Sequence, residues 1–232
     1  MNNLATTIND QGNLEEAATI RREVLEKMRQ ILGNDHPNTV TAMNNLALTL
    51  SDQGKLDEAA IIQIEVVERR RRILGDNHPD TLRAMGNLAN TYGEQGKLDE
   101  AAEMRIEVVK KTKQILGDDH PDTLTAMNNL ALSLACQGKF DEAFAIQTEV
   151  LESMRRILGH SHPDTLLTMT HIAFILGDMG KLDEAVEIQT EVLEEMMRNF
   201  GEHHPYTTNA KSNLDTILAL LARKRRWRCC SW

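Results

Sequence analysis

The apolar residues of the chain recur in steps of three and four along two kinds of segment. A shorter segment, such as residues 38–52, carries them at Val40, Met43, Leu46, Ala47 and Leu50. A longer segment, such as residues 98–116, carries them at Leu98, Ala101, Met104, Val108, Ile115 and Leu116. Because this spacing places apolar side chains on one face of a helix, the pattern predicts pairs of amphipathic helices.

Each shorter segment begins with His-Pro and ends near a glycine, as residues 36–54 show. Proline suits the first position of a helix, and the residue before a proline is kept out of the α conformation, as at a cap. Glycine can adopt the left-handed conformation that closes helices. We therefore expect the histidines to cap helices rather than to bind metal; they are His36, His78, His120, His162 and His204.

The His-Pro dipeptide returns every 42 residues, which is the mark of a repeat architecture. A helix pair cannot bury both of its apolar faces alone, but stacked copies bury them against their neighbours. The predicted fold is all-α, a right-handed α-solenoid (superhelix) of stacked antiparallel helix pairs. The array covers residues 1–221, with helix pairs at 1–33, 38–75, 80–117, 122–159 and 164–201 and a capping helix at 205–221. A basic tail at 222–232 follows the array, and we expect it to be disordered.

The pattern "NNLA…QGKLDEA" resembles the tetratricopeptide repeat (TPR). The 42-residue form with "LG..HP.T" between units is similar to the repeats of kinesin light chains, and to the near-identical arrays of fungal and bacterial NLR-like signalling proteins. Residues 1–5 match residues 43–47, so we expect the chain to be a piece of a longer array that begins inside a first helix. The resemblance implies a scaffold that binds proteins or peptides in the concave groove formed by the first helices.

An amide side chain can both donate and accept hydrogen bonds, so it suits the backbone of a bound peptide. The resemblance places one column of such residues in the groove; the equal alternative is that these amides bond to the neighbouring helix and set the repeat spacing. The column consists of Asn3, Asn45, Asn87, Asn129, His171 and Asn213. Its predicted neighbours on the same face are Asn44, Arg83, Asn90, Asn128 and Phe174.

The formal net charge of −9 argues against nucleic acid as a partner, because phosphate repels an acidic protein. The sequence offers no nucleophile beside a base and no phosphate-binding loop, so we expect no catalytic site, no metal and no cofactor. Its three cysteines show no disulfide or zinc spacing, and no apolar run could span a bilayer, which favours a cytoplasmic location.

Two charged segments leave alternatives open. The arginines at 69–72 spread around their helix, so we expect them to be solvated, with some pairing to Glu65 and Glu68. The tail at 222–232, "ARKRRWRCCSW", is either a segment without a defined role or a membrane or nuclear signal. As an alternative function, the end repeats could associate with other copies, making the chain an oligomerisation or ligand-sensing module of an NLR-like protein.

Overall fold

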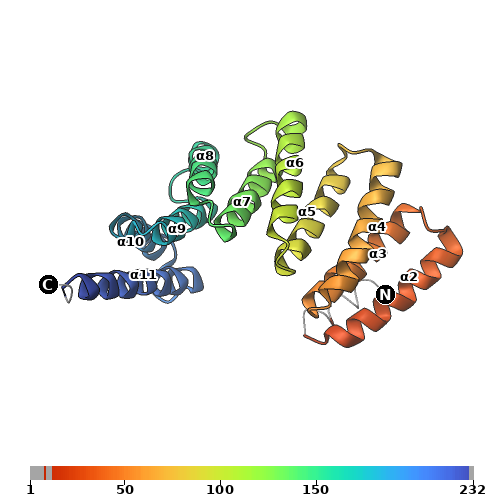
Figure 1. The fold of residues 1–232 in the computed structure, drawn as a ribbon, viewed down its shortest axis with the longest axis horizontal. Coiled ribbons are helices and arrows are strands. Elements are labelled where there is room, and N and C mark those ends of the chain that lie inside the picture. The colour runs from red at the N-terminus through yellow and green to blue at the C-terminus, as the bar shows by residue number, and fades with distance from the viewer. Residues whose placement is uncertain (1–7, 9–11, 230–232) are drawn as a thin grey trace. The chain divides into compact units, whose positions relative to one another are not determined.

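The structure, a computed structural model, describes residue 8 and residues 12–229 and divides into two compact units, residues 1–118 and 119–232. The described residues form helices and no strand, and Figure 1 shows their order. Unit 1 contains α2 (Leu14–Leu32), α3 (Pro37–Asp52), α4 (Leu56–Leu74), α5 (Pro79–Glu94) and α6 (Leu98–Leu116). Unit 2 contains α7 (Pro121–Cys136), α8 (Phe140–Leu158), α9 (Pro163–Asp178), α10 (Leu182–Phe200) and α11 (Pro205–Cys229).

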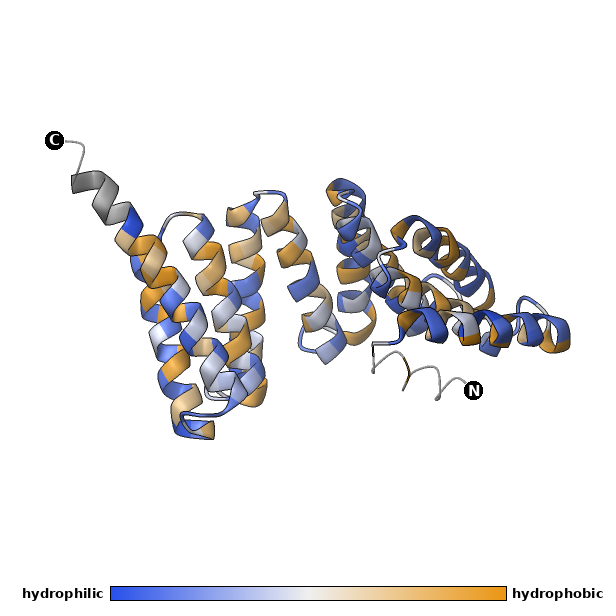
Figure 2. Ribbon diagram, turned by 90° about the horizontal axis from the view of Figure 1, so that it is seen from below, coloured by the Kyte–Doolittle hydropathy of each residue, from blue (hydrophilic) through white to orange (hydrophobic). Residues whose placement is uncertain are grey.

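Within each unit, every helix packs against the helix that follows it in the chain, and α3 also contacts α5. Figure 2 shows that polar and apolar residues alternate along the helices, as the spacing of three and four predicts. The repeated alanines Ala17, Ala59, Ala101, Ala143 and Ala185 are all 0% exposed, which lets paired helices approach closely. The predicted all-α solenoid fold of stacked helix pairs is confirmed.

Every His-Pro corner has a histidine cap, and four of the five add a threonine hydrogen bond. At the first corner, His36 Nδ1 accepts a hydrogen bond from the backbone N–H of Asn38 at 3.2 Å. Thr39 Oγ1 then donates to the carbonyl of Gly33, the residue that ends the preceding helix, at 2.8 Å. The predicted histidine caps are confirmed at all five corners, and the threonine bond recurs at Thr81, Thr165 and Thr207.

The turn after each first helix is closed by glycine. Gly54 has a φ of +74°, a left-handed conformation that residues with a side chain rarely adopt. This conformation lets the Lys55 N–H reach back to the Leu50 carbonyl at 2.9 Å, which satisfies a carbonyl at the helix end. The glycine ends that the sequence predicts are therefore confirmed.

Two features of the helices differ from the sequence prediction: the exposure of Ile115 and the end of the last helix. Ile115, expected within the apolar stripe, is 42% exposed, and its equivalents Ile73 and Ile157 are 39% and 47% exposed, so the stripe is not covered in the last turn of these helices. Helix α11 continues past Leu221 to Cys229 rather than ending where the tail was expected to become disordered. Residues 222–229 are helical because nothing in that stretch is a strong helix breaker, while residues 230–232 lie outside the described part of the chain.

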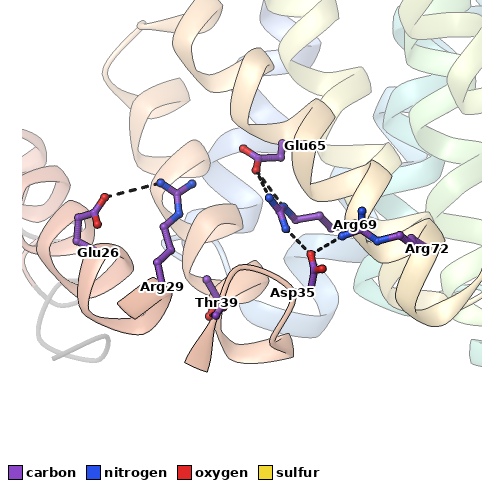
Figure 3. A network of polar contacts seen from close by, with 8 residues as sticks. Glu26, Arg29, Asp35, Thr39, Glu65, Arg69 and Arg72 are labelled. Carbon is purple, nitrogen blue, oxygen red and sulfur yellow. Dashed lines mark hydrogen bonds and ion pairs between the residues drawn. The ribbon is translucent and has the colours of Figure 1, made fainter. Parts of the chain in front are cut away.

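An ion-pair network connects one corner of unit 1 to the next second helix (Figure 3). The carboxylate of Asp35 accepts hydrogen bonds from both Arg69 and Arg72 of α4. Arg69 also bonds to Glu65 one turn away, at 2.6 and 2.9 Å, so the predicted pairing with Glu65 is confirmed. Hydrogen bonds to Glu65, together with its charge, raise the pKa of Arg69. The network fixes the loop before His36 against α4.

Candidate binding face of the first helices

The structure exposes a mixed polar and apolar face on the first helices of unit 2. We define the first-helix face of unit 2 as Asn128, Leu132, Leu167, His171 and Phe174, which lie on α7 and α9. Leu132 is 60% exposed and Leu167 52% exposed, although both belong to helices with well-buried opposite sides. Large apolar side chains on an open face are typical of surfaces that bind another molecule.

In unit 1, the predicted groove residues bond mainly to the protein itself. The Asn87 amide of α5 donates to the Asn44 amide oxygen of α3 at 3.2 Å. Asn90 accepts a hydrogen bond from Arg105 of α6 at 2.7 Å. Arg83 forms an ion pair with Asp80 one turn earlier in α5. For the Asn44–Asn87 pair, the structure therefore favours the alternative role of fixing the spacing between repeats.

Unit 2 departs from this arrangement at the corresponding pair, Asn128 and His171. Both residues line a cavity of about 370 Å³ between α7, the end of α8 and α9. The Oδ1 atom of Asn128 is buried and has no hydrogen-bond partner. The remaining lining residues are Asp119, Pro121, Leu124, Thr125, Met154, Ile157, Leu158, Asp164, Leu167 and Thr168.

The imidazole of His171 and the amide of Asn128 give this cavity its polar chemistry. Burial lowers the pKa of His171, so the ring is neutral at neutral pH, with one nitrogen able to donate and one able to accept. An unpaired buried acceptor such as Asn128 Oδ1 costs about 1–3 kcal/mol. A ligand that donates an N–H to this oxygen would recover that free energy.

Replacing His171 by asparagine is expected to make the stability of the protein less dependent on pH. Because burial lowers the pKa of His171, the folded state favours the neutral ring, and the unfolded chain binds the proton more readily. The stabilisation is present above the unfolded-state pKa of about 6.5 and is lost as the pH falls below it. Urea unfolding at about pH 7.5 and pH 5 should show a smaller loss of free energy in His171→Asn than in the wild type. An equal loss in both proteins would contradict this role of His171.

The other predicted groove residues are spread over both units. Asn45 and Asn213 are half-buried, Asn129 is exposed and Phe174 is 40% exposed, and Asn3 lies outside the described residues. None of these four described residues lines the 370 Å³ cavity. Whether the asparagine column binds a ligand therefore stays a prediction.

The sequence analysis missed the cavity residues Met154, Ile157, Asp164 and Leu167. The available signal is a difference between repeats: Met154 and Leu167 stand where the unit two periods earlier has Arg70 and Arg83, whereas Ile157 and Asp164 are the same in both units. Across the described residues, no group of three His, Cys, Asp or Glu side chains could hold a metal ion. No described helix is long and apolar enough to cross a membrane.

Comparisons with known proteins agree with this architecture. Family models described as tetratricopeptide repeat match residues 1–38, 39–80, 82–105, 95–156 and 122–194. No curated protein matches the sequence.

The fold is similar to several solved structures. One is the putative kinesin light chain with nearly identical TPR-like repeats from Podosopora anserina, at 25% identity and a TM-score of 0.78, covering 86% of this chain and 94% of that one. A variant form of that protein has 25% identity and a TM-score of 0.79, covering 85% and 93%. A third is BtubC (BKLC) from P. vanneervenii, at 20% identity and a TM-score of 0.74, covering 94% and 88%.

The family models together span most of the chain, and the matches to residues 1–38 and 39–80 each end beside a His-Pro dipeptide. The structural neighbours include kinesin-light-chain-like repeats built in the same way. The chain therefore belongs to the tetratricopeptide repeat family.

Proposed function

We propose that the protein is a non-catalytic scaffold that binds a segment of another protein on the first-helix face of unit 2. TPR arrays are typical of protein–protein interaction scaffolds, and the structural neighbours have the same helix pairs. The observation that carries the proposal is the 370 Å³ cavity beside the unpaired Oδ1 atom of Asn128. A cytoplasmic location is part of the same proposal.

The titratable groups support a role in binding rather than catalysis. The corner histidines accept hydrogen bonds from their own helix N-termini, so they cap helices. Hydrogen bonds from Ser153 and Arg156 lower the pKa of Asp119, and a hydrogen bond from Ser161 lowers that of Glu195. These shifts arise from contacts that hold loops to helices, whereas a catalytic site gathers perturbed groups around one reacting atom.

The chemistry of the face suits an extended peptide. A peptide backbone offers N–H donors that Asn128 Oδ1 can accept, and its carbonyls can accept from the neutral His171 ring. The exposed side chains of Leu132, Leu167 and Phe174 provide apolar area for the side chains of that peptide. Apolar contact supplies most of the free energy, and the two polar groups select the backbone register.

A peptide library selected on the immobilised chain tests this proposal. Selected peptides should lose at least about tenfold in affinity, or about 1.4 kcal/mol, when Leu132 and Phe174 are both replaced by glutamate, because charge then replaces apolar contact. Isothermal titration calorimetry would measure the change. The matched control is Ile61→Glu, which places the same charge on an exposed isoleucine of a second helix.

The double variant must keep the helical circular dichroism of the wild type for the comparison to hold. If selected peptides bind the double variant as tightly as the wild type, or if Ile61→Glu weakens them equally, the first-helix face is not the binding surface. Either result would leave self-association through an end repeat as the better account. Exposed Leu218 and Leu220 on α11 would then be the contact to test, by sedimentation velocity over a range of concentrations.

A further inference from the structure

Two pockets in the described part of the chain occupy equivalent positions, one in each unit. Each lies between two first helices and the end of the second helix that joins them. The unit 1 pocket has a volume of about 40 Å³, against about 370 Å³ in unit 2. The corresponding residues are two repeat periods apart: Pro37, Val40, Thr41, Arg70, Ile73, Leu74 and Asp80 in unit 1, and Pro121, Leu124, Thr125, Met154, Ile157, Leu158 and Asp164 in unit 2.

In unit 1, the side chain of Arg70 lines the pocket. Nη1 of Arg70, at the end of α4, donates to the Asp80 carbonyl of α5 at 2.7 Å. Its side chain is partly buried, and this burial lowers the pKa of the guanidinium. A second arginine, Arg83, forms an ion pair with the Asp80 carboxylate. Arg70 therefore lines the unit 1 pocket, while Arg83 pairs with the Asp80 carboxylate from outside the pocket lining.

In unit 2 both cations are replaced by apolar side chains. Met154 stands in the place of Arg70, and Leu167 in the place of Arg83. The carboxylate of Asp164, which corresponds to Asp80, lies 3.8 Å from His162 Nδ1. That nitrogen already accepts the Asp164 backbone N–H, so in this tautomer it has no proton to offer the carboxylate. The unit 2 pocket is therefore open and walled largely by apolar groups, and two acceptors belong to its lining.

The two acceptors are the Asp164 carboxylate and Asn128 Oδ1. The carbonyl of Asp164 accepts the Thr168 hydroxyl at 2.9 Å, so the carboxylate is the acceptor that Asp164 leaves open to a ligand. The other carboxylate of the lining, Asp119, already bonds to Ser153 and Arg156. A ligand that fits must combine an apolar stem with several N–H donors.

We propose that this unit 2 pocket binds an arginine side chain from the partner segment, in the way that Arg70 occupies the corresponding pocket of unit 1. The arginine stem would lie against Met154, Ile157 and Leu167, with its guanidinium at the Asp164 carboxylate. Arginine carries five N–H donors on a planar group, whereas the lysine ammonium is a compact, strongly hydrated charge. The inference rests on the proposed function, because it names the chemistry of the segment that the first-helix face binds.

The test uses the full chain and a fluorescein-labelled peptide, Ala-Gly-Arg-Leu-Arg-Gly-Ala, with versions in which lysine or citrulline replaces both arginines. Fluorescence anisotropy should show at least about tenfold tighter binding for arginine than for either replacement. Met154→Arg should weaken the arginine peptide about tenfold, because the variant fills its own pocket as Arg70 does in unit 1. The charge control is Met197→Arg, at an exposed methionine of α10.

The reciprocal variant tests the internal comparison. Arg70→Met combined with Arg83→Leu copies the unit 2 pocket into unit 1 and should add a second binding event for the arginine peptide. Equal binding of arginine and lysine peptides, equal weakening by Met154→Arg and Met197→Arg, or a single event in the reciprocal variant would each overturn the inference. Suppose that library-selected peptides bind less tightly when Leu132 and Phe174 are replaced by glutamate, but bind Met154→Arg as tightly as the wild type. That result would overturn the arginine inference and leave the proposed function intact.

Discussion

Replacing Leu166 by alanine is expected to lower the free energy of unfolding by about 3 kcal/mol. Leu166 is 0% exposed, and its side chain packs in a cluster with Met169, Val192, Met196 and Ala210. This cluster joins three consecutive helices, α9, α10 and α11. The substitution removes buried methyl groups and leaves a space that the surrounding helices cannot fully close.

The neighbouring residue provides the matched control. Leu167 has the same side chain on the next position of α9 but is 52% exposed, so Leu167→Ala should change the stability by less than about 0.5 kcal/mol. Urea unfolding followed by circular dichroism would measure both variants. Similar losses of stability in the two variants would mean that α9 does not bury the side that carries Leu166.

Replacing Thr165 by valine is expected to lower the free energy of unfolding by about 1–2 kcal/mol. The Thr165 hydroxyl is 0% exposed and donates to the Gly159 carbonyl at 2.8 Å, across the corner between α8 and α9. Valine keeps the shape of the side chain but cannot donate, so the carbonyl loses this bond. The expected loss is large for a single hydroxyl because it removes the bond that ties the end of one repeat to the start of the next.

Thr125→Val is the control for this change, since Thr125 is an exposed threonine of α7. Thermal unfolding of both variants should show a clear decrease in melting temperature for Thr165→Val and little change for Thr125→Val. A comparable melting temperature for both would show that the hydroxyl bond at the corner contributes nothing measurable to stability.

The repeat period made the fold predictable from the sequence. Two local signals, proline at the start of a helix and glycine after its end, recur with a regular apolar spacing, so each repeat confirms the boundaries of the others. The histidine caps followed from the same signals. Thr39 could also have been found, because threonine recurs two residues after the proline at the same period, yet periodicity alone does not show that its hydroxyl reaches Gly33.

The candidate site was only partly predictable. His171 and Asn128 were predicted to share a face of the first helices and both line the cavity, but the cavity itself depends on side chains from three helices. A single sequence shows that Met154 replaces Arg70, but it does not show that Arg70 fills a pocket. That conclusion required the contact between Arg70 and the Asp80 carbonyl.

The exposed isoleucines show a second limit of the pattern. Ile115 has the spacing of a buried position, but it and its equivalents Ile73 and Ile157 are exposed in the last turns of their helices. Apolar spacing indicates which side of a helix a residue occupies. Whether that side is covered at a given turn depends on how the neighbouring helices pack, which only the structure shows.

Chemical-shift mapping by NMR tests the central claim most directly. A peptide selected on the wild-type chain would be titrated into the isotope-labelled protein. We expect the largest shift changes at Asn128, Leu132, His171 and Phe174, on the first helices of unit 2. Largest changes on the outward sides of α8 and α10, with the first helices unaffected, would contradict the claim that the first-helix face binds the partner.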